Sequence, residues 1–337
     1  MIGKKVLWSS IIVIGILLIS VPMFAQPKDY KDIKVLFIPK QEGNPYFDAV
    51  ANGFKLAQKE LGFQFAVKGP QLGTATSQIE YIEAAVQDKT DVIMLAANSK
   101  DALNQTLDDA RAAGTHIVII NQDIPGSETH REVAIMPTDF DLIGDIEVET
   151  LGSIIGYKGD IAILSATTDA PDQNYWIAGM KKALLKPKYS KMKLLEVVYG
   201  DDEPEKSTTE MEALIVKYPT LSGVIAPTSV GVHAAAKVLQ TKELGSKIAL
   251  VGLGIPSELR QFIKDGTMKK FNEWNMVNEG YLAGYYACAL ARGEVKLGPG
   301  STFKAGKLGM YTVTKKDQII SGPPLTFNAS NVDNYDF

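Results

Sequence analysis

The segment Ile38-Pro39-Lys40-Gln41-Glu42-Gly43-Asn44-Pro45-Tyr46-Phe47 joins a predicted strand to a predicted helix. It follows the apolar run 33–37 and opens a stretch with apolar residues at helical spacing from Phe47 to Leu61. In open α/β sheets, ligands bind at the edge where strands hand over to helices. Lysine and asparagine offer hydrogen bonds to hydroxyls, and aromatic rings offer flat apolar faces. The segment therefore suits a small polyol or sugar, although an ordinary strand-to-helix loop with a helix-starting proline explains it equally well.

Strand and helix patterns alternate along the rest of the chain. Strands are predicted at 33–37, 63–67, 91–97, 116–120 and 132–136, and again at 160–164, 194–199, 223–226, 248–253, 270–274 and 308–313. Helices are predicted between them, among them 45–61, 76–87, 140–155 and 277–292, with Ser99 as the N-cap of another. Such alternation predicts parallel sheets with helices on both faces. Because the pattern restarts after Pro137, the predicted fold class is α/β with two Rossmann-like lobes and a cleft between them.

The N-terminal 25 residues have the order of a secretory signal peptide. Lys4 and Lys5 precede an apolar stretch, and Ala25 is a suitable last residue before cleavage. An uncleaved membrane anchor is the alternative, because the apolar run is near the lower limit for spanning. No cysteine follows the stretch to accept a lipid, and 26–32 form a polar lead-in. We therefore expect a cleaved chain in a bacterial periplasm that is not a lipoprotein.

Composition excludes several classes of function. The 337 residues are 45% hydrophobic and 22% charged, and the net charge of −4 gives no basic footprint for nucleic acid. The chain has one cysteine and three histidines far apart, so no metal-ligand spacing is present and no metal is expected. Nucleotide-binding, zinc-helix and serine-elbow motifs are absent from the sequence. No cofactor and no catalytic residue are predicted.

Polar and aromatic residues gather at the ends of the predicted strands. Amides and carboxylates pair with vicinal hydroxyls through directional hydrogen bonds, whereas aromatic rings stack on the C–H face of a sugar. Each aromatic residue has core packing as its alternative role, and Asp172 and Gln173 have helix capping. The candidate ligand-binding residues are Lys40, Asn44, Tyr46, Phe47, Asn121, Asp123, Asp172, Gln173, Trp176, Ser229, Trp274 and Asn275. The pair Asp201-Asp202 is interpreted as a turn rather than as paired acid/base carboxylates.

Short motifs along nearly the whole chain after residue 25 resemble periplasmic solute-binding proteins of the ribose-binding class. Within that class they resemble the branch that binds autoinducer-2 or rhamnose. The motifs lie at 37–40, 44–47, 172–176, 225–227 and 334–337. The resemblance implies two lobes joined by three crossovers, placed near Pro137, Trp274-Asn275 and Thr312. Lobe 1 would comprise 33–136 plus 277–303, and lobe 2 would comprise 138–274 plus 304–337.

The same resemblance implies a ligand and partners. In the autoinducer-2 branch, the expected lysine, aspartate, glutamine and proline match Lys40, Asp172, Gln173 and Pro227. Asn121 and Ser229 stand where that branch has aspartate and alanine. The stretches 199–202, 227–231 and 252–258 look closer to the rhamnose-binding members. The resemblance therefore favours a rhamnose-like deoxysugar delivered to the membrane permease of an ABC transporter, with autoinducer-2, a sensory receptor partner or a sugar-active enzyme as alternatives.

Overall fold

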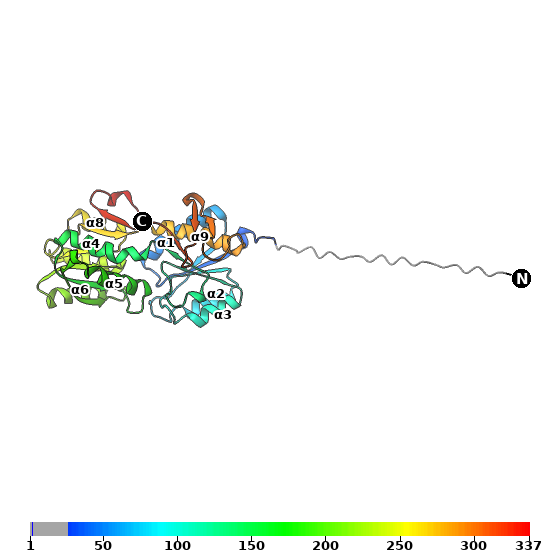
Figure 1. The fold of residues 1–337 in the computed structure, drawn as a ribbon, viewed down its shortest axis with the longest axis horizontal. Helices are drawn as coiled ribbons and strands as arrows, with labels where there is room; N and C mark the ends of the chain where they lie inside the picture. Colours follow the sequence, from blue (N-terminus) through cyan, green and yellow to red (C-terminus); the bar gives the residue numbers. More distant parts are fainter. Residues whose placement is uncertain (1, 3–25) are drawn as a thin grey trace.

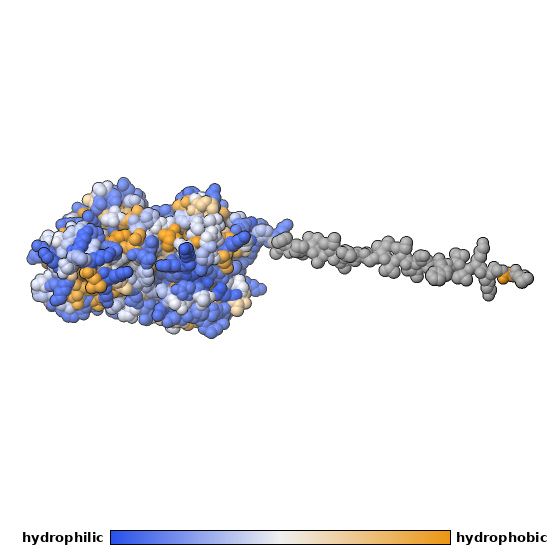
Figure 2. All heavy atoms as spheres, viewed as in Figure 1, coloured by the Kyte–Doolittle hydropathy of each residue, from blue (hydrophilic) through white to orange (hydrophobic). Residues whose placement is uncertain are grey.

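A computed structural model of the chain describes residue 2 and residues 26–337. The predicted signal peptide, apart from residue 2, lies outside the described residues. Figure 1 shows two lobes side by side, with α4, α5, α6 and α8 in one and α1, α2, α3 and α9 in the other. On the face in Figure 2 the surface is largely hydrophilic, with separate hydrophobic patches. Among residues 26–337, no helix is long and apolar enough to cross a membrane.

Lobe 1 is built on a six-stranded parallel sheet in the order β13-β5-β4-β3-β1-β2. Its strands are β1 (Lys34–Ile38), β2 (Gln64–Val67), β3 (Val92–Leu95), β4 (His116–Ile120), β5 (Val133–Met136) and β13 (Gln318–Ile320). Its helices are α1 (Pro45–Leu61), α2 (Ile79–Gln87), α3 (Asn104–Ala112) and α9 (Met276–Ala291). A small antiparallel pair, β11 (Thr302–Lys304) with β12 (Met310–Thr312), precedes β13.

Lobe 2 is built on a four-stranded parallel sheet in the order β7-β6-β8-β9. Its strands are β6 (Lys158–Ser165), β7 (Lys191–Tyr199), β8 (Leu221–Ala226) and β9 (Ala249–Gly252). Its helices are α4 (Ile143–Ile155), α5 (Pro171–Leu184), α6 (Pro204–Lys217), α7 (Ser229–Thr241) and α8 (Pro256–Lys264). The antiparallel pair β10 (Lys270–Glu273) and β14 (Leu325–Asn328) adjoins it through a bridge between Leu253 and Asn272. The α/β fold class with parallel sheets is confirmed.

The chain passes between the sheets three times, and the third passage differs from the prediction. The first two lie between β5 and α4 and between β10 and α9. The third was expected near Thr312, with 304–337 in lobe 2. Instead β13 pairs with β5 in the sheet of lobe 1, so the chain crosses between β13 and β14. The prediction was wrong for 304–320, which lie with lobe 1. Strand β13 was missed because a strand of three residues carries too few positions to show a hydrophobic pattern.

Several element boundaries also differ from the predictions. The helix expected from residue 76 begins at Ile79. The one expected from residue 140 begins with a 3₁₀ turn, Phe140–Leu142, before α4. Ser99 does not cap α3, which begins at Asn104; its hydroxyl accepts a hydrogen bond from the amide of Ala102 at 3.2 Å. Serine favours local turns as readily as helix caps, which explains the misplacement.

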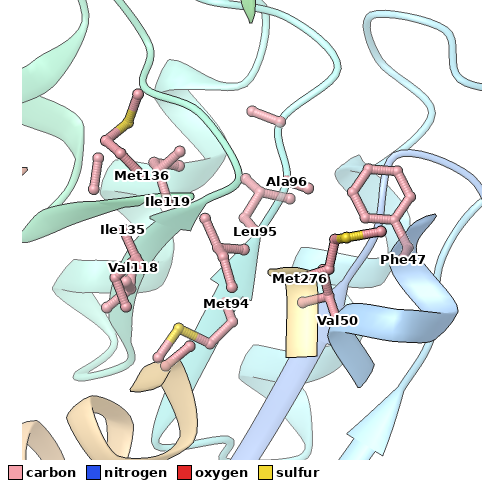
Figure 3. Close-up of a cluster of buried hydrophobic side chains, with 14 of the residues drawn as sticks. Phe47, Val50, Met94, Leu95, Ala96, Val118, Ile119, Ile135, Met136 and Met276 are labelled. Atoms are coloured by element: carbon pink, nitrogen blue, oxygen red, sulfur yellow. The ribbon is translucent and has the colours of Figure 1, made fainter. Parts of the chain in front are cut away.

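The core explains why the strands form where they do. All of β3 is buried, as its continuous apolar run predicts for a parallel strand covered on both faces. Figure 3 shows the buried cluster that surrounds Met94 and Leu95. Helices α1 and α9 pack closely because glycines meet their neighbours' backbones. A Cβ atom on Gly280 would lie 1.9 Å from the carbonyl oxygen of Val50, and one on Gly53 would lie 2.1 Å from that of Val277.

Candidate functional site

A small cavity lies between the lobes at the carboxyl ends of the strands. It measures about 40 Å³, well below the ~300–1,000 Å³ usual for small-molecule sites. Both lobes contribute to its wall, as the cleft of two facing sheets predicts. The lining residues are Lys40, Asn44, Tyr46, Phe47, Asn121, Asp172, Gln173, Trp176, Asp202, Pro227, Thr228, Ser229, Leu253, Glu273 and Trp274.

Lys40 bridges the lobes across this cavity. Its ammonium group lies 2.6 Å from Oδ1 of Asp172, and both residues are buried. Asp172 is the second residue of α5, where the helix dipole favours a negative charge. The loop that carries Lys40 is fixed by Asn98, whose Nδ2 donates to the Lys40 carbonyl at 2.9 Å. The ion pair therefore joins two rigidly held elements, one from each lobe.

Gln173 is held by two hydrogen bonds within lobe 2. Its Nε2 donates to the carbonyl of Pro227 at 2.6 Å, and its Oε1 accepts from the hydroxyl of Ser165 at 2.8 Å. The side chain thus links the ends of β6 and β8 and fixes the wall of the cavity on that side. Ser229 follows as the first residue of α7 and also lines the cavity.

Aromatic rings form the wall nearest the junction of the lobes. Trp274 Nε1 donates to the hydroxyl of Tyr46 at 2.8 Å, and that hydroxyl donates to Oε2 of Glu279 at 2.9 Å. The ring centroids of Trp274 and Trp176 are 5.8 Å apart. Trp176 also lines the cavity, and its Nε1 is buried with no hydrogen-bond partner among residues 26–337. Phe47 completes the apolar side.

Carboxyl groups that the sequence analysis did not select also reach the cavity. Burial, with Glu147 and Glu279 nearby, raises the pKa of Glu273 well above its usual range. Asp202 is half-buried, and desolvation between the lobes raises the pKa of its carboxyl, which accepts a hydrogen bond from Thr228. Both residues follow the rule that sites form at strand ends, since Asp202 follows β7 and Glu273 ends β10. Applying this rule to the end of every observed strand would therefore have selected both residues.

Two more buried glutamates surround the junction without lining the cavity. Burial raises the pKa of Glu147 on α4 to about 8 and that of Glu279 on α9 to about 8. Glu147 accepts a hydrogen bond from Nδ2 of Asn272 at 2.9 Å. Together with Glu273, three acids from both lobes and the connecting strand β10 lie buried around the junction.

Two predicted residues lie away from the cavity wall. Asp123 is held by Arg131, with the guanidinium Nε 2.6 Å from Oδ1 and Nη2 2.6 Å from Oδ2. Asn275 caps α9 by accepting a hydrogen bond from the amide of Asn278 at 2.9 Å. Asn44 lines the cavity and also caps α1 through the amide of Tyr46 at 3.0 Å. The structure brings the other predicted residues together around one cavity.

The set of groups favours binding of a neutral, hydroxylated molecule. One ammonium, several carboxyl groups and amides supply donors and acceptors from both lobes, while the aromatic rings supply apolar faces. Within residues 26–337, no group of three or more histidine, cysteine or acidic residues is arranged to hold a metal ion. The cavity is smaller than the ~300–1,000 Å³ usual for small-molecule sites, so a larger occupant requires its wall to rearrange.

Residues 35–295 match the periplasmic binding protein domain. The chain belongs to this family. The family predicted from the motifs is thereby confirmed. The two lobes, each built on a parallel sheet, are the two halves of this domain, and the cavity lies between them.

Solved structures of sugar-transport proteins resemble this periplasmic binding protein over nearly its full length. A solute-binding protein of an ABC transporter from Clostridium phytofermentas, with bound L-rhamnose, is 33% identical with a TM-score of 0.86; the match covers 90% of this chain and 98% of that one. A sugar ABC transporter protein from Actinomyces odontolyticus is 38% identical with a TM-score of 0.73, covering 92% of this chain and 100% of that one.

A curated relative is more distant. The D-apiose import binding protein of Actinobacillus succinogenes is 24% identical over 206 residues, which is 60% of this chain. The match spans 65% of the length of that relative. The rhamnose-bound protein and the D-apiose import protein thus name different sugars, and the Actinomyces protein names no particular one.

Proposed function

We propose that this periplasmic binding protein is the extracytoplasmic substrate-binding subunit of an ABC importer and takes up a small sugar, with a rhamnose-like deoxysugar favoured. The observation that carries the proposal is the interlobe cavity, where Lys40 and Asp172 meet from opposite lobes among amides and aromatic rings. The similarity to a rhamnose-bound protein at 33% identity supports the choice of sugar.

In the proposed mechanism the sugar takes over the ion pair that closes the cleft. Lys40 and Asn121 belong to lobe 1, whereas Asp172, Gln173 and Ser229 belong to lobe 2. Lysine only donates, the ionised aspartate only accepts, and the amides do both. A sugar ring between Lys40 and Asp172 can accept a hydrogen bond from the ammonium group and donate one to the carboxylate. Each of the two groups then keeps a partner after the ion pair is broken. Closure then excludes water and strengthens these hydrogen bonds, and the ligand stabilises the closed form by its differential affinity for it.

The deoxy position has a complementary wall in this proposal. Phe47, Leu253 and Trp274 are buried apolar residues that line the cavity. A hydroxymethyl group against these residues would leave a buried hydroxyl without a hydrogen-bond partner, at a cost of about 1–3 kcal/mol. A methyl group packs there without this cost. The favoured ligand is therefore a 6-deoxyhexose rather than a hexose that carries a 6-hydroxyl group.

Autoinducer-2 is the second candidate ligand. The four residues that match the autoinducer-2 branch, Lys40, Asp172, Gln173 and Pro227, all line the cavity. Asn121 and Ser229 line it as well and differ from that branch in chemistry, since each replaces the expected residue with a neutral polar side chain. For either ligand, we propose that the closed form docks on a membrane permease. If the ligand is autoinducer-2, a sensory receptor is the alternative partner.

A thermal-shift screen of the chain from residue 26 onward tests the proposal. The panel contains L-rhamnose, D-arabinose, D-apiose, other pentoses, deoxyhexoses and autoinducer-2. Binding to the native state raises the unfolding temperature by mass action, so we expect a clear shift with L-rhamnose. A larger shift with autoinducer-2 would favour the second candidate. A flat response across the panel would contradict the proposal, as would conversion of any sugar to product during a long incubation.

A further inference from the structure

A larger groove lies beside the cavity that contains Lys40 and Asp172, which is called the central cavity below. Its volume is about 630 Å³, within the ~300–1,000 Å³ usual for small-molecule sites. The two hollows share Asn44 and Asp202 in their walls. Like the central cavity, this groove is formed by both lobes: loop 41–45 supplies one side, and helices α6, α7 and α8 supply the other.

We propose that this groove is a subsite for the second unit of a glycoside whose first sugar occupies the central cavity. The inference rests on the proposed function and narrows its substrate class to a neutral disaccharide or a similar neutral glycoside. Asn44 and Asp202 stand at the boundary, where the glycosidic bond passes from one hollow to the other. Because both lobes line the groove, closure over the first sugar also forms the wall that holds the second.

The lining of the groove has the composition of a sugar site. Pro45, Pro204, Val230 and Ala234 supply apolar surface on which the C–H face of a ring can pack. Hydrogen-bonding groups surround this surface, and those that line the groove are Gln41, Glu42, Asp202, Glu205, Thr208, His233, Lys237 and Glu258. Glu205 and Lys237 line the groove with exposed side chains, and within residues 26–337 neither forms an ion pair. Their polar groups therefore remain free for hydroxyls.

Charge determines which glycosides fit. Four carboxylates, Glu42, Asp202, Glu205 and Glu258, line the groove beside one lysine, Lys237, and one histidine, His233, whose Nδ1 lies 3.8 Å from Oε2 of Glu258. A uronic acid would add a further negative charge to this set and be repelled. A neutral hydroxylated unit pairs with the carboxylates without that repulsion. The groove therefore discriminates against acidic disaccharides even when their first sugar matches the central cavity.

Calorimetric titration of the chain from residue 26 onward tests the subsite. The ligands are L-rhamnose, a neutral rhamnosyl disaccharide, and a disaccharide that joins rhamnose to a uronic acid. We expect the neutral disaccharide to bind about tenfold more tightly than L-rhamnose, and the acidic one to show no such gain. Equal or weaker binding of the neutral disaccharide, while L-rhamnose binds, overturns the subsite and leaves the proposed function standing. Failure of all three ligands to bind overturns both.

A groove-filling variant distinguishes the subsite from a general effect on closure. Val230 lines the groove on α7 and is absent from the wall of the central cavity. V230F should remove the gain of the disaccharide and leave the affinity for L-rhamnose within about twofold. V216F is the matched control, because Val216 lies 81% exposed on α6 outside both hollows. A disaccharide gain that survives V230F contradicts the inference.

Discussion

Lys40 and Asp172 come from opposite lobes, and Lys40 Nζ lies 2.6 Å from Asp172 Oδ1 in the wall of the central cavity. Both side chains are nearly withdrawn from water, with 11% and 4% of their surfaces exposed. Removing one partner of a buried ion pair is costly, because the charge of the other partner then stays buried without compensation. The pair therefore stabilises the observed arrangement of the lobes, and in the proposed function a ligand replaces it by satisfying both charges.

Replacing Asp172 with asparagine should destabilise the ligand-free protein. The change leaves the Lys40 ammonium buried without its counter-charge, which costs roughly 3 kcal/mol. Urea unfolding followed by circular dichroism measures the loss. D145N is the matched control, since Asp145 pairs with Lys186 at 2.6 Å on the surface, with about half of each side chain exposed. Equal stability of the two variants would contradict the role given to the Lys40–Asp172 pair.

Replacing Tyr46 with phenylalanine should weaken the junction of the lobes. The Tyr46 hydroxyl accepts from Trp274 and donates to Glu279, so its removal leaves two buried groups unpaired. The expected loss in free energy of unfolding is about 1–3 kcal/mol for each group. Tyr175 provides the control, because its hydroxyl bonds to Asp141 and its side chain is 41% exposed. Y175F should unfold at nearly the same urea concentration as the wild type.

Stability should fall as the pH rises from about 5 to 8. The pKa values of Glu147 and Glu279 rise to about 8 in the folded chain, and that of Glu273 rises as well. A carboxyl group whose pKa is raised in the folded state binds more protons in the folded chain than in the unfolded chain. Its contribution to stability is therefore complete below the unfolded pKa and is lost as the pH approaches the folded pKa. Each group contributes a slope of up to about 1.4 kcal/mol per pH unit in this window. Urea unfolding at half-unit pH steps measures it.

The variant E147Q isolates one of these groups. Glutamine keeps an oxygen that can accept the hydrogen bond from Asn272 and has no proton to lose. The pH slope should become shallower and the stability at pH 8 should exceed that of the wild type. The acids whose pKa values are lowered, such as Glu196 and Asp265, act below pH 4.5 and do not enter this window. A wild-type stability that rises between pH 5 and 8 would exclude the explanation.

The contact between α1 and α9 should not tolerate a side chain at Gly280. A Cβ atom there would lie 1.9 Å from the carbonyl oxygen of Val50, so G280A forces the helices apart. We expect a loss of about 1–3 kcal/mol or more in the free energy of unfolding. G322A is the control, because a Cβ at Gly322 meets nothing within 4 Å. Indistinguishable thermal unfolding of the two variants would show that the helices adjust freely.

Most of the fold could be predicted from the sequence because its central strands are continuous apolar runs that are covered on both faces. The run 91–97 is an example, since burial of both faces leaves no polar position in β3. Strand β13 could not be predicted, because three residues show no period and its partner β5 lies far away in sequence. The third crossover was therefore misplaced.

The candidate site was predictable to the extent that strand ends gather at one edge. Lys40, Asp172 and Gln173 were found in this way. Asp123 was selected on the same rule, but its carboxylate is held by Arg131, a partner that the fold provides and the sequence does not reveal. Glu273 was missed because the predicted strand 270–274 places it inside the strand, whereas the observed strand β10 ends at Glu273.

Calorimetric titration of the wild type and of D172A with L-rhamnose tests whether the sugar takes the place of Lys40 beside Asp172. We expect saturable binding of one sugar per wild-type chain and loss of this binding in D172A, because the sugar must replace Lys40 as the partner of Asp172. D145A should bind like the wild type. Unchanged affinity in D172A, or wild-type binding of none of the small sugars in the thermal-shift panel, would contradict the account.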